Sequence, residues 1–268
     1  MTARRPTDAR FDASVTLDGP WVAAVPDEDL RRSFADPHFD DSTWLPVAVP
    51  GLWRSTPALA DEDEVLYRTR FDATWPGPGS RTWLSIDGLC YQGDIWLDGA
   101  YIGDTEGYFQ PHVFEISEAV KARTSHVLAI EASCRTPGDL TAKRNITGVL
   151  QHWDNLDPSL NPGGVWRRVR IEDTGPIRIN TLRVTVVEAD SAVAILQFHA
   201  KLDSVATHTV VVRTLVDRSS DSEGTGQIAT VEEEQVLATG SNEIEWRVAI
   251  EQPQLWWPHD LGDPNLHD

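Results

Sequence analysis

The stretch Asp94-Ile-Trp-Leu-Asp-Gly-Ala-Tyr-Ile102 decides the fold class of this chain. Its centre, Asp98-Gly99, is one of the strongest short signals for the tight turn of a β-hairpin. The residues on either side, 94–97 and 101–102, are rich in the aromatic and β-branched side chains that strands favour. We therefore expect two antiparallel strands joined by a two-residue turn.

Further strand patterns lie on both sides of this hairpin. The runs 65–71 and 82–87 precede it, and the runs 112–116 and 126–132 follow it. Turn residues separate these runs, and helical periodicity is almost absent, apart from one helical turn expected at 117–121. Such spacing is typical of β-sandwiches rather than of alternating strands and helices. The sequence predicts an all-β protein.

A second series of strands begins after a turn at residues 173–176, Asp-Thr-Gly-Pro. It consists of the runs 177–187, 192–200, 207–216, 231–237 and 242–249, and the hydrophilic stretch 218–227 is expected to be a solvated hairpin loop. An immunoglobulin-like sandwich has about seven strands, so five or six runs predict an incomplete one. We place the two domains at 1–175 and 176–268.

The charge balance restricts the classes of ligand and partner. The chain has 23 basic and 42 acidic residues and a net charge of −19, which repels nucleic acids and anionic lipid surfaces. No apolar stretch reaches the ~18 residues of a membrane-spanning helix. Because the start of the chain lacks the apolar core of a signal peptide, we expect a cytoplasmic protein. The negative charge favours an uncharged ligand. The oligomeric state stays open.

Two cysteines, Cys90 and Cys134, each lie in a strand-like run. Two buried thiols are the simpler interpretation, and a bridge between them, which is unusual in cytosol, is the alternative. The eight histidines show no metal-ligand spacing, so we expect no metal and no cofactor. Acidic turns such as Asp40-Asp41 leave a calcium ion as the less favoured alternative.

The segment 135–162 differs from the rest of the chain because it has little strand pattern over nearly 30 residues. A loop of that length inside a compact domain is uncommon and is usually functional or disordered. Apolar residues within it, such as Ile146, Leu150 and Trp153, argue against disorder. We expect an ordered, functional loop.

Six segments that occur in order along the chain together carry a resemblance to a known family. They are Leu17-Asp-Gly-Pro-Trp21, Trp44-Leu-Pro-Val-Ala-Val-Pro-Gly-Leu-Trp53, Tyr67-Arg-Thr-Arg-Phe71, the run from Ile95 to Ile116, Gly163-Gly-Val-Trp-Arg167, and Leu255-Trp-Trp-Pro258 with Gly262-Asp-Pro-Asn-Leu266. They resemble the non-catalytic front part of glycoside hydrolase family 2, which contains β-galactosidases, β-glucuronidases and β-mannosidases. The resemblance implies a jelly-roll, galactose-binding-like sandwich followed by an immunoglobulin-like sandwich.

The same resemblance implies where catalysis takes place. In the family, two glutamates on a barrel domain that follows these sandwiches perform retaining hydrolysis, held about 5 Å apart. We therefore expect no catalytic residue in this chain and a parent protein that is an exo-acting, retaining β-glycosidase. The pair Asn242-Glu243 resembles the family's Asn-Glu acid/base motif, but it lies in a strand-like run and is interpreted as coincidence.

By the same resemblance, Gln151-His-Trp-Asp-Asn155 corresponds to the loop that reaches the monosaccharide in β-mannosidases. Trp153 and Asp154 are therefore the candidate sugar-binding residues, with His152 as a third. An indole can pack on the C–H face of a sugar ring, and a carboxylate can accept two hydroxyl hydrogen bonds. β-Mannosidases have a second Trp where Asn155 stands, so the sugar stays open.

Two alternatives to this function remain. The chain could be a stand-alone carbohydrate-binding module, or it could be a structural scaffold. In the scaffold, Trp153 would only pack the loop onto the sandwich and Asp154 would cap a turn.

Overall fold

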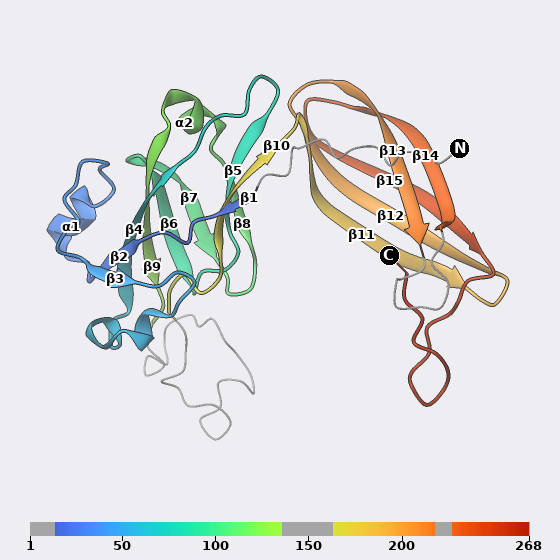
Figure 1. Ribbon diagram of the computed structural model, residues 1–268, viewed down its shortest axis with the longest axis horizontal. Helices are drawn as coiled ribbons and strands as arrows, with labels where there is room; N and C mark the ends of the chain where they lie inside the picture. Colours follow the sequence, from blue (N-terminus) through green and yellow to red (C-terminus); the bar gives the residue numbers. More distant parts are fainter. Residues whose placement is uncertain (1–13, 136–162, 218–226, 268) are drawn as a thin grey trace. The chain divides into compact units, whose positions relative to one another are not determined.

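The computed structural model describes residues 14–135, 163–217 and 227–267. The chain divides into two compact units, Met1–Thr174 and Gly175–Asp268. Figure 1 shows that strands make up most of both units, so the prediction of an all-β protein is confirmed.

The first unit is a sandwich of two antiparallel sheets. The four-stranded sheet has the order β1 (Ser14–Thr16), β10 (Val169–Thr174), β5 (Arg81–Ile86) and β8 (His112–Glu115). The six-stranded sheet has the order β3 (Leu45–Val47), β2 (Trp21–Ala24), β4 (Glu64–Asp72), β9 (Ser125–Ser133), β6 (Gln92–Leu97) and β7 (Ala100–Glu106).

Most neighbouring strands of the first unit are distant in sequence, because the chain passes repeatedly from one sheet to the other. Strand β5 pairs with β10 and β8, whereas β4, which precedes it, pairs with β2 and β9 in the other sheet. Only β6 and β7 form the short hairpin that the sequence predicts, with Asp98 and Gly99 at positive φ values of 53° and 86°. The predicted sandwich is confirmed.

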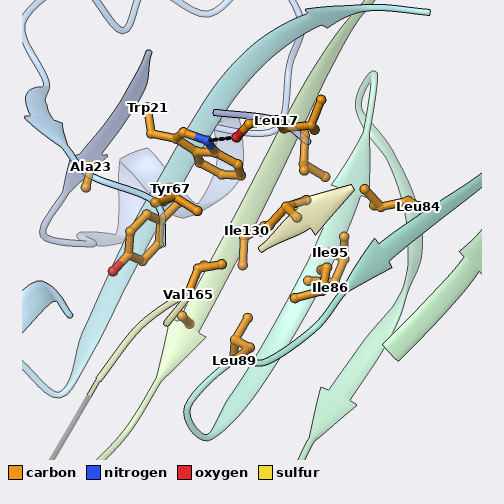
Figure 2. Packing of buried hydrophobic residues seen from close by; sticks show 14 of the residues in the cluster. Leu17, Trp21, Ala23, Tyr67, Leu84, Ile86, Leu89, Ile95, Ile130 and Val165 are labelled. Atoms are coloured by element: carbon orange, nitrogen blue, oxygen red, sulfur yellow. Dashed lines mark hydrogen bonds between the residues drawn. The ribbon is translucent and has the colours of Figure 1, made fainter. Parts of the chain in front are cut away.

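The core of the first unit lies between the two sheets. It contains side chains such as Leu84 and Ile86 from β5 and Ile95 from β6, all of them fully buried. Figure 2 shows Trp21 beside Leu17, whose backbone carbonyl accepts a hydrogen bond of 2.9 Å from the indole Nε1. A buried Trp needs a partner for this N–H group, and the turn between β1 and β2 supplies it.

Short helices complete the first unit. The helix α2 (Ser117–Ala122) lies where one helical turn was expected, whereas α1 (Glu28–Ser33) was not anticipated. With six residues, α1 is too short to show a helical period, and its start is marked instead by Asp27, whose side chain accepts hydrogen bonds from the backbone of Asp29 and Leu30. Two 3-10 turns, η1 (Trp53–Ser55) and η2 (Pro57–Leu59), precede β4.

A second, smaller core lies on the outer face of the six-stranded sheet. Phe34 and Trp44, from the segment that includes α1, pack there on Leu66 and Ala129. The same segment supplies the partner of a charged residue in β4, because the fully buried Arg68 donates from Nε to Asp41 at 2.8 Å. Packing and one buried ion pair therefore hold this segment on the sheet.

The second unit is a sandwich of three and two antiparallel strands. One sheet has the order β11 (Ile177–Ala189), β12 (Val193–Ser204) and β15 (Gly240–Glu251), and the other pairs β13 (His208–Asp217) with β14 (Gln227–Leu237). Trp246 stacks on Phe198 at 5.2 Å and donates at 2.7 Å to the hydroxyl of Thr214 in β13. The immunoglobulin-like sandwich is confirmed as a fold class.

One inner face of the second unit is uncovered. Leu182 and Val184 of β11 lie opposite Ala200 and Phe198 of β12, and directly opposed residues of paired strands share a face. Phe198 is buried, yet Leu182 and Val184 are 53% and 49% exposed. In the described part of this unit, the two-stranded sheet does not extend over β11.

Candidate functional site

The predicted sugar-binding residues His152, Trp153 and Asp154 lie outside the described residues. The structure describes the two points where their segment leaves and re-enters the first unit. The segment leaves after Arg135, two residues beyond the end of β9, and it returns at Gly163, six residues before β10 begins. We call the first the outgoing point and the second the returning point. Both lie against the 3-10 turn η1.

Hydrogen bonds of the Cys134 amide and carbonyl hold the outgoing point in place. The amide of Cys134 donates to the carbonyl of Asp63 at 2.8 Å. Arg54 of η1 donates from Nη2 to the carbonyl of Cys134 and from Nη1 to the carbonyl of Ala60, both at 2.9 Å. Arg135 lies 3.4 Å from the carboxylate of Asp63. One guanidinium therefore joins η1 to the end of β9.

The returning point depends on two glycines. The carbonyl of Gly163 accepts from the amide of Trp53 at 2.9 Å, and a Cβ at position 163 would lie 2.3 Å from the Trp53 indole. Gly164 has a φ of +112°, and a Cβ there would lie 2.5 Å from the hydroxyl of Tyr67. Side chains do not fit at such distances, and L-residues rarely adopt such a φ. The Gly-Gly of the sequence pattern is required by this close approach.

A cluster of aromatic rings, which we call the aromatic cluster, follows the returning point. It consists of Tyr108, Phe109 and Trp166, with ring centroids 4.3 to 5.5 Å apart, and the guanidinium of Arg167 lies 4.3 Å from the Trp166 ring. The indole of Trp166 donates to the carbonyl of Tyr108 at 2.9 Å. The rings are tilted or edge-to-face to one another, and Phe109 is 61% exposed, so the cluster offers one aromatic ring of the kind that stacks on sugar rings. Sequence reasoning left Arg167 either in a structural ion pair or packed against Trp166, and it did not identify Phe109.

A hollow of about 450 Å³ lies on the outer face of the six-stranded sheet, beside the outgoing point. Arg31 of α1 forms ion pairs with Glu64 and, at 2.8 Å, with Glu131. Burial raises the pKa of Glu131, the positive charge of Arg31 opposes this, and the neighbouring Glu64 adds to it. We call it the acidic hollow, and its lining is Arg31, Glu64, Gln92, Gly93, Asp94, Tyr101, Asp104, Thr105, Glu106, Glu131 and Ser133.

Hydrogen bonds within the acidic hollow already use some of its polar groups. The hydroxyl of Tyr101 donates to Asp94 at 2.9 Å, and this bond raises the pKa of Tyr101 to about 12. The remaining carboxylate oxygens can accept from hydroxyl or ammonium groups. Sequence reasoning did not find this hollow, since its acids come from four strands and look like solvated turns and edges in the sequence.

The pair Asn242-Glu243 has structural contacts. The amide of Asn242 bonds the carbonyls of Ala238 and Gly240 at 2.9 and 2.8 Å, and so holds the turn before β15. Glu243 is exposed and forms an ion pair with Lys201 at 2.8 Å, and this hydrogen bond lowers the pKa of Glu243. The two residues take part in the strand and its turn.

Within the described ranges, no group of three or more His, Cys, Asp or Glu side chains is placed to hold a metal ion. None of the helices there has the length and apolar character needed to cross a membrane.

Two successive antiparallel sandwiches, the first closed by a Gly-Gly-Val-Trp segment against η1, define a pair of β-sandwich accessory domains. The chain belongs to glycoside hydrolase family 2. Residues 53–167 match the family model described as the glycosyl hydrolase 2 galactose-binding domain-like domain, and residues 177–268 match the model described as glycosyl hydrolases family 2. The resemblance drawn from the six sequence segments is thereby confirmed.

Curated relatives include two kinds of glycosidase. The chain is 26% identical over 221 residues to β-mannosidase B of Aspergillus oryzae, a match that covers 75% of this chain and 25% of the relative. It is 24% identical over 249 residues to the exo-β-D-glucosaminidase of Hypocrea virens, which covers 90% and 25%. The chain thus spans about a quarter of the length of the curated relatives it matches.

Solved structures share the fold of the chain. A β-glucuronidase of Bacteroides uniformis superimposes with a TM-score of 0.75 at 18% identity, over 96% of this chain and 30% of that one. A β-D-mannosidase of Dictyoglomus thermophilum gives a TM-score of 0.69 at 18% identity, over 95% and 33%. At such identities the likeness establishes the fold alone.

Proposed function

We propose that this chain is the non-catalytic front part of an exo-acting, retaining β-glycosidase, and that its segment 136–162 supplies one wall of the sugar pocket. Family membership and the names of the curated relatives, which are glycosidases of β-linked sugars, support the proposal. In it, Trp153 stacks on the terminal sugar, Asp154 accepts hydrogen bonds from its hydroxyl groups, and His152 lies next to them.

The observation that carries this proposal is the anchoring of the segment at both ends. Cys134 and Gly163 are each held by backbone hydrogen bonds to η1 or to the residues around it, at 2.8 to 2.9 Å. A binding group acts on a substrate only if its support is fixed to within a fraction of an ångström. A buried Trp, an Arg and two glycines that cannot be replaced form these anchors: Trp53, Arg54, Gly163 and Gly164. A plain connection between strands does not require such contacts.

The test is a substitution in the longer protein that contains this chain. In Asp154→Asn the side chain keeps its size but loses the charge that strengthens hydrogen bonds to sugar hydroxyls. We expect kcat/KM for an aryl β-glycoside to fall about 10- to 100-fold. Asp157→Asn, in the same segment, is the matched control and should change kcat/KM by less than about threefold. Equal effects of the two substitutions, or none, would contradict the proposal.

A specific observation favours a second candidate function, a stand-alone carbohydrate-binding module. Phe109 in the aromatic cluster is 61% exposed, as a sugar-stacking side chain would be. Calorimetry of this chain alone with monosaccharides and oligosaccharides distinguishes the two functions. Binding that is lost in Phe109→Ala supports the module, and no binding supports a pocket that needs the rest of the glycosidase.

A further inference from the structure

The thiols of Cys90 and Cys134 lie against each other in the core of the first unit. Their sulfur atoms are 3.5 Å apart, and the two residues are 0% and 1% exposed. No disulfide bond joins the two sulfur atoms in the described structure. The residues are 44 positions apart in the sequence, so only the fold brings them together.

Backbone hydrogen bonds fix both cysteines in this position. The amide of Tyr91 donates to the carbonyl of Ser133 at 2.9 Å, which joins the two neighbouring chain segments next to the cysteines. Cys90 also exchanges two hydrogen bonds with Gly164, at 2.9 and 3.1 Å. The paired backbone segments therefore fix the backbone of the two cysteines, and the side-chain rotamers set the remaining distance between the sulfur atoms.

The two cysteines also mark the anchors of the segment 136–162. Cys134 is separated from that segment by Arg135 alone, and Cys90 pairs with Gly164 one residue beyond Gly163. A covalent bond between their sulfur atoms would join the outgoing point directly to the partner of the returning point.

We propose that Cys90 and Cys134 form a reversible disulfide site, with a low-molecular-weight disulfide such as oxidised glutathione as the oxidant. A disulfide bond is about 2.05 Å long, so the sulfur atoms must approach by roughly 1.5 Å, a distance that small side-chain rotations cover. The inference is independent of the proposed sugar-binding role.

The chemistry is thiol–disulfide exchange in two steps. Because both sulfur atoms are buried, the exchange takes place in molecules in which the first unit is locally open. There the thiolate of one cysteine attacks a sulfur of oxidised glutathione, and one glutathione leaves as thiolate and takes up a proton. The thiolate of the second cysteine then attacks the sulfur of the first, and the second glutathione leaves. Two cysteines are oxidised to one disulfide, and one glutathione disulfide is reduced to two glutathione thiols.

The bridge stabilises the fold, and the fold must therefore stabilise the bridge by the same factor. The test equilibrates the whole chain in glutathione buffers of increasing [GSH]²/[GSSG], once folded in buffer and once unfolded in urea. Remaining thiols are alkylated, and mass spectrometry then gives the fraction of molecules that carry the bridge. We expect the native bridge to persist at a ratio at least about tenfold higher than the bridge in urea. A native midpoint equal to or below the unfolded one would overturn the proposal, as would disulfides between molecules.

Thermal unfolding gives a second measurement that does not depend on any variant. The oxidised chain should melt roughly 5–10 °C above the reduced chain, because the bridge closes a long loop, and the reductant dithiothreitol should reverse the shift. Cys90→Ser and Cys134→Ser should each abolish both the mass loss of about 2 Da on oxidation and the melting shift. A shift that survives in either variant would also overturn the proposal.

Discussion

Asp41 neutralises the charge of the fully buried Arg68 in β4. It accepts from Nε of Arg68 at 2.8 Å and from Nη1 of Arg70 at 2.7 Å. Arg68 also donates to the carbonyls of Phe34 and Asp36. Because these carbonyls and Asp41 all belong to the segment that covers the outer face of the sheet, the Arg68 side chain joins that segment to β4.

We expect Asp41→Asn to lower the free energy of unfolding by about 3–5 kcal/mol, since removing one partner of a buried pair leaves an uncompensated charge. Urea unfolding at neutral pH measures the loss. Asp40→Asn is the matched control: Asp40 is exposed and accepts from the Ser42 amide, a contact that Asn also makes, so its effect should stay below about 1 kcal/mol.

The same pair predicts how stability depends on pH. Burial raises the pKa of Asp41, but the hydrogen bonds from Arg68 and Arg70 outweigh burial and hold it below its usual range. A group whose pKa is lowered by folding stabilises the fold above its ordinary pKa, about 4, and that contribution is lost as the pH falls further. The urea midpoint of the unchanged chain should therefore drop more steeply below about pH 4 than that of Asp41→Asn. Parallel curves would show that Asp41 does not carry the effect.

At the scale of the element, the hairpin β6–β7 shows how a local signal and a tertiary contact support each other. Asp98 and Gly99 form the turn, and the carboxylate of Asp98 also accepts from the amide of Val127 at 2.9 Å and contacts His126 at 2.8 Å. The turn therefore fixes the hairpin to β9 as well as closing it.

Replacing Gly99 tests this turn. Gly99 has a φ of +86°, where an L-residue is strained, so Gly99→Ala should lower the free energy of unfolding by about 1–2 kcal/mol. Gly19→Ala is the control, because a Cβ at position 19 meets nothing within 4 Å and its φ lies outside the positive range. Urea unfolding should show no loss for that control, and a comparable loss in both variants would contradict the argument.

Elements differed in how well the sequence predicted them. The run 126–132 corresponds to β9, and the run 65–71 corresponds to β4, because both strands are long and rich in apolar, aromatic and β-branched residues. The short strands β1, β2, β3 and β10 and the helix α1 were not predicted as elements. Their pairing or packing partners are distant in sequence.

At the scale of the whole molecule, the chain by itself should not hydrolyse glycosides. The family resemblance places the catalytic glutamates on a barrel domain, and this chain matches the two sandwich domains. We expect no turnover of aryl β-mannosides or β-galactosides by the purified chain, with the longer protein as the positive control. The acidic hollow brings several carboxylates together, among them Glu64, Asp94 and Glu131. Turnover that copurifies with the chain and disappears in Glu131→Gln would therefore contradict this prediction.

Trp256 and Trp257 are 57% and 47% exposed in this chain. The backbone around them is ordered by an isolated bridge between Trp256 and Pro264 and by a 2.9 Å bond from the amide of Trp257 to Asp263. These contacts hold the turn without burying the indoles.

The sequence by itself determined the fold class, the order of the long strands along the chain, the hairpin at Asp98-Gly99 and the family. Each of these can be read from short stretches of neighbouring residues. Only the tertiary structure decided that Gly163 must be a glycine beside Trp53, that Arg68 is neutralised by Asp41, and that Cys90 lies 3.5 Å from Cys134. Those facts depend on contacts between residues tens of positions apart. Such contacts arise when strands distant in sequence are paired, and no local pattern records the pairing.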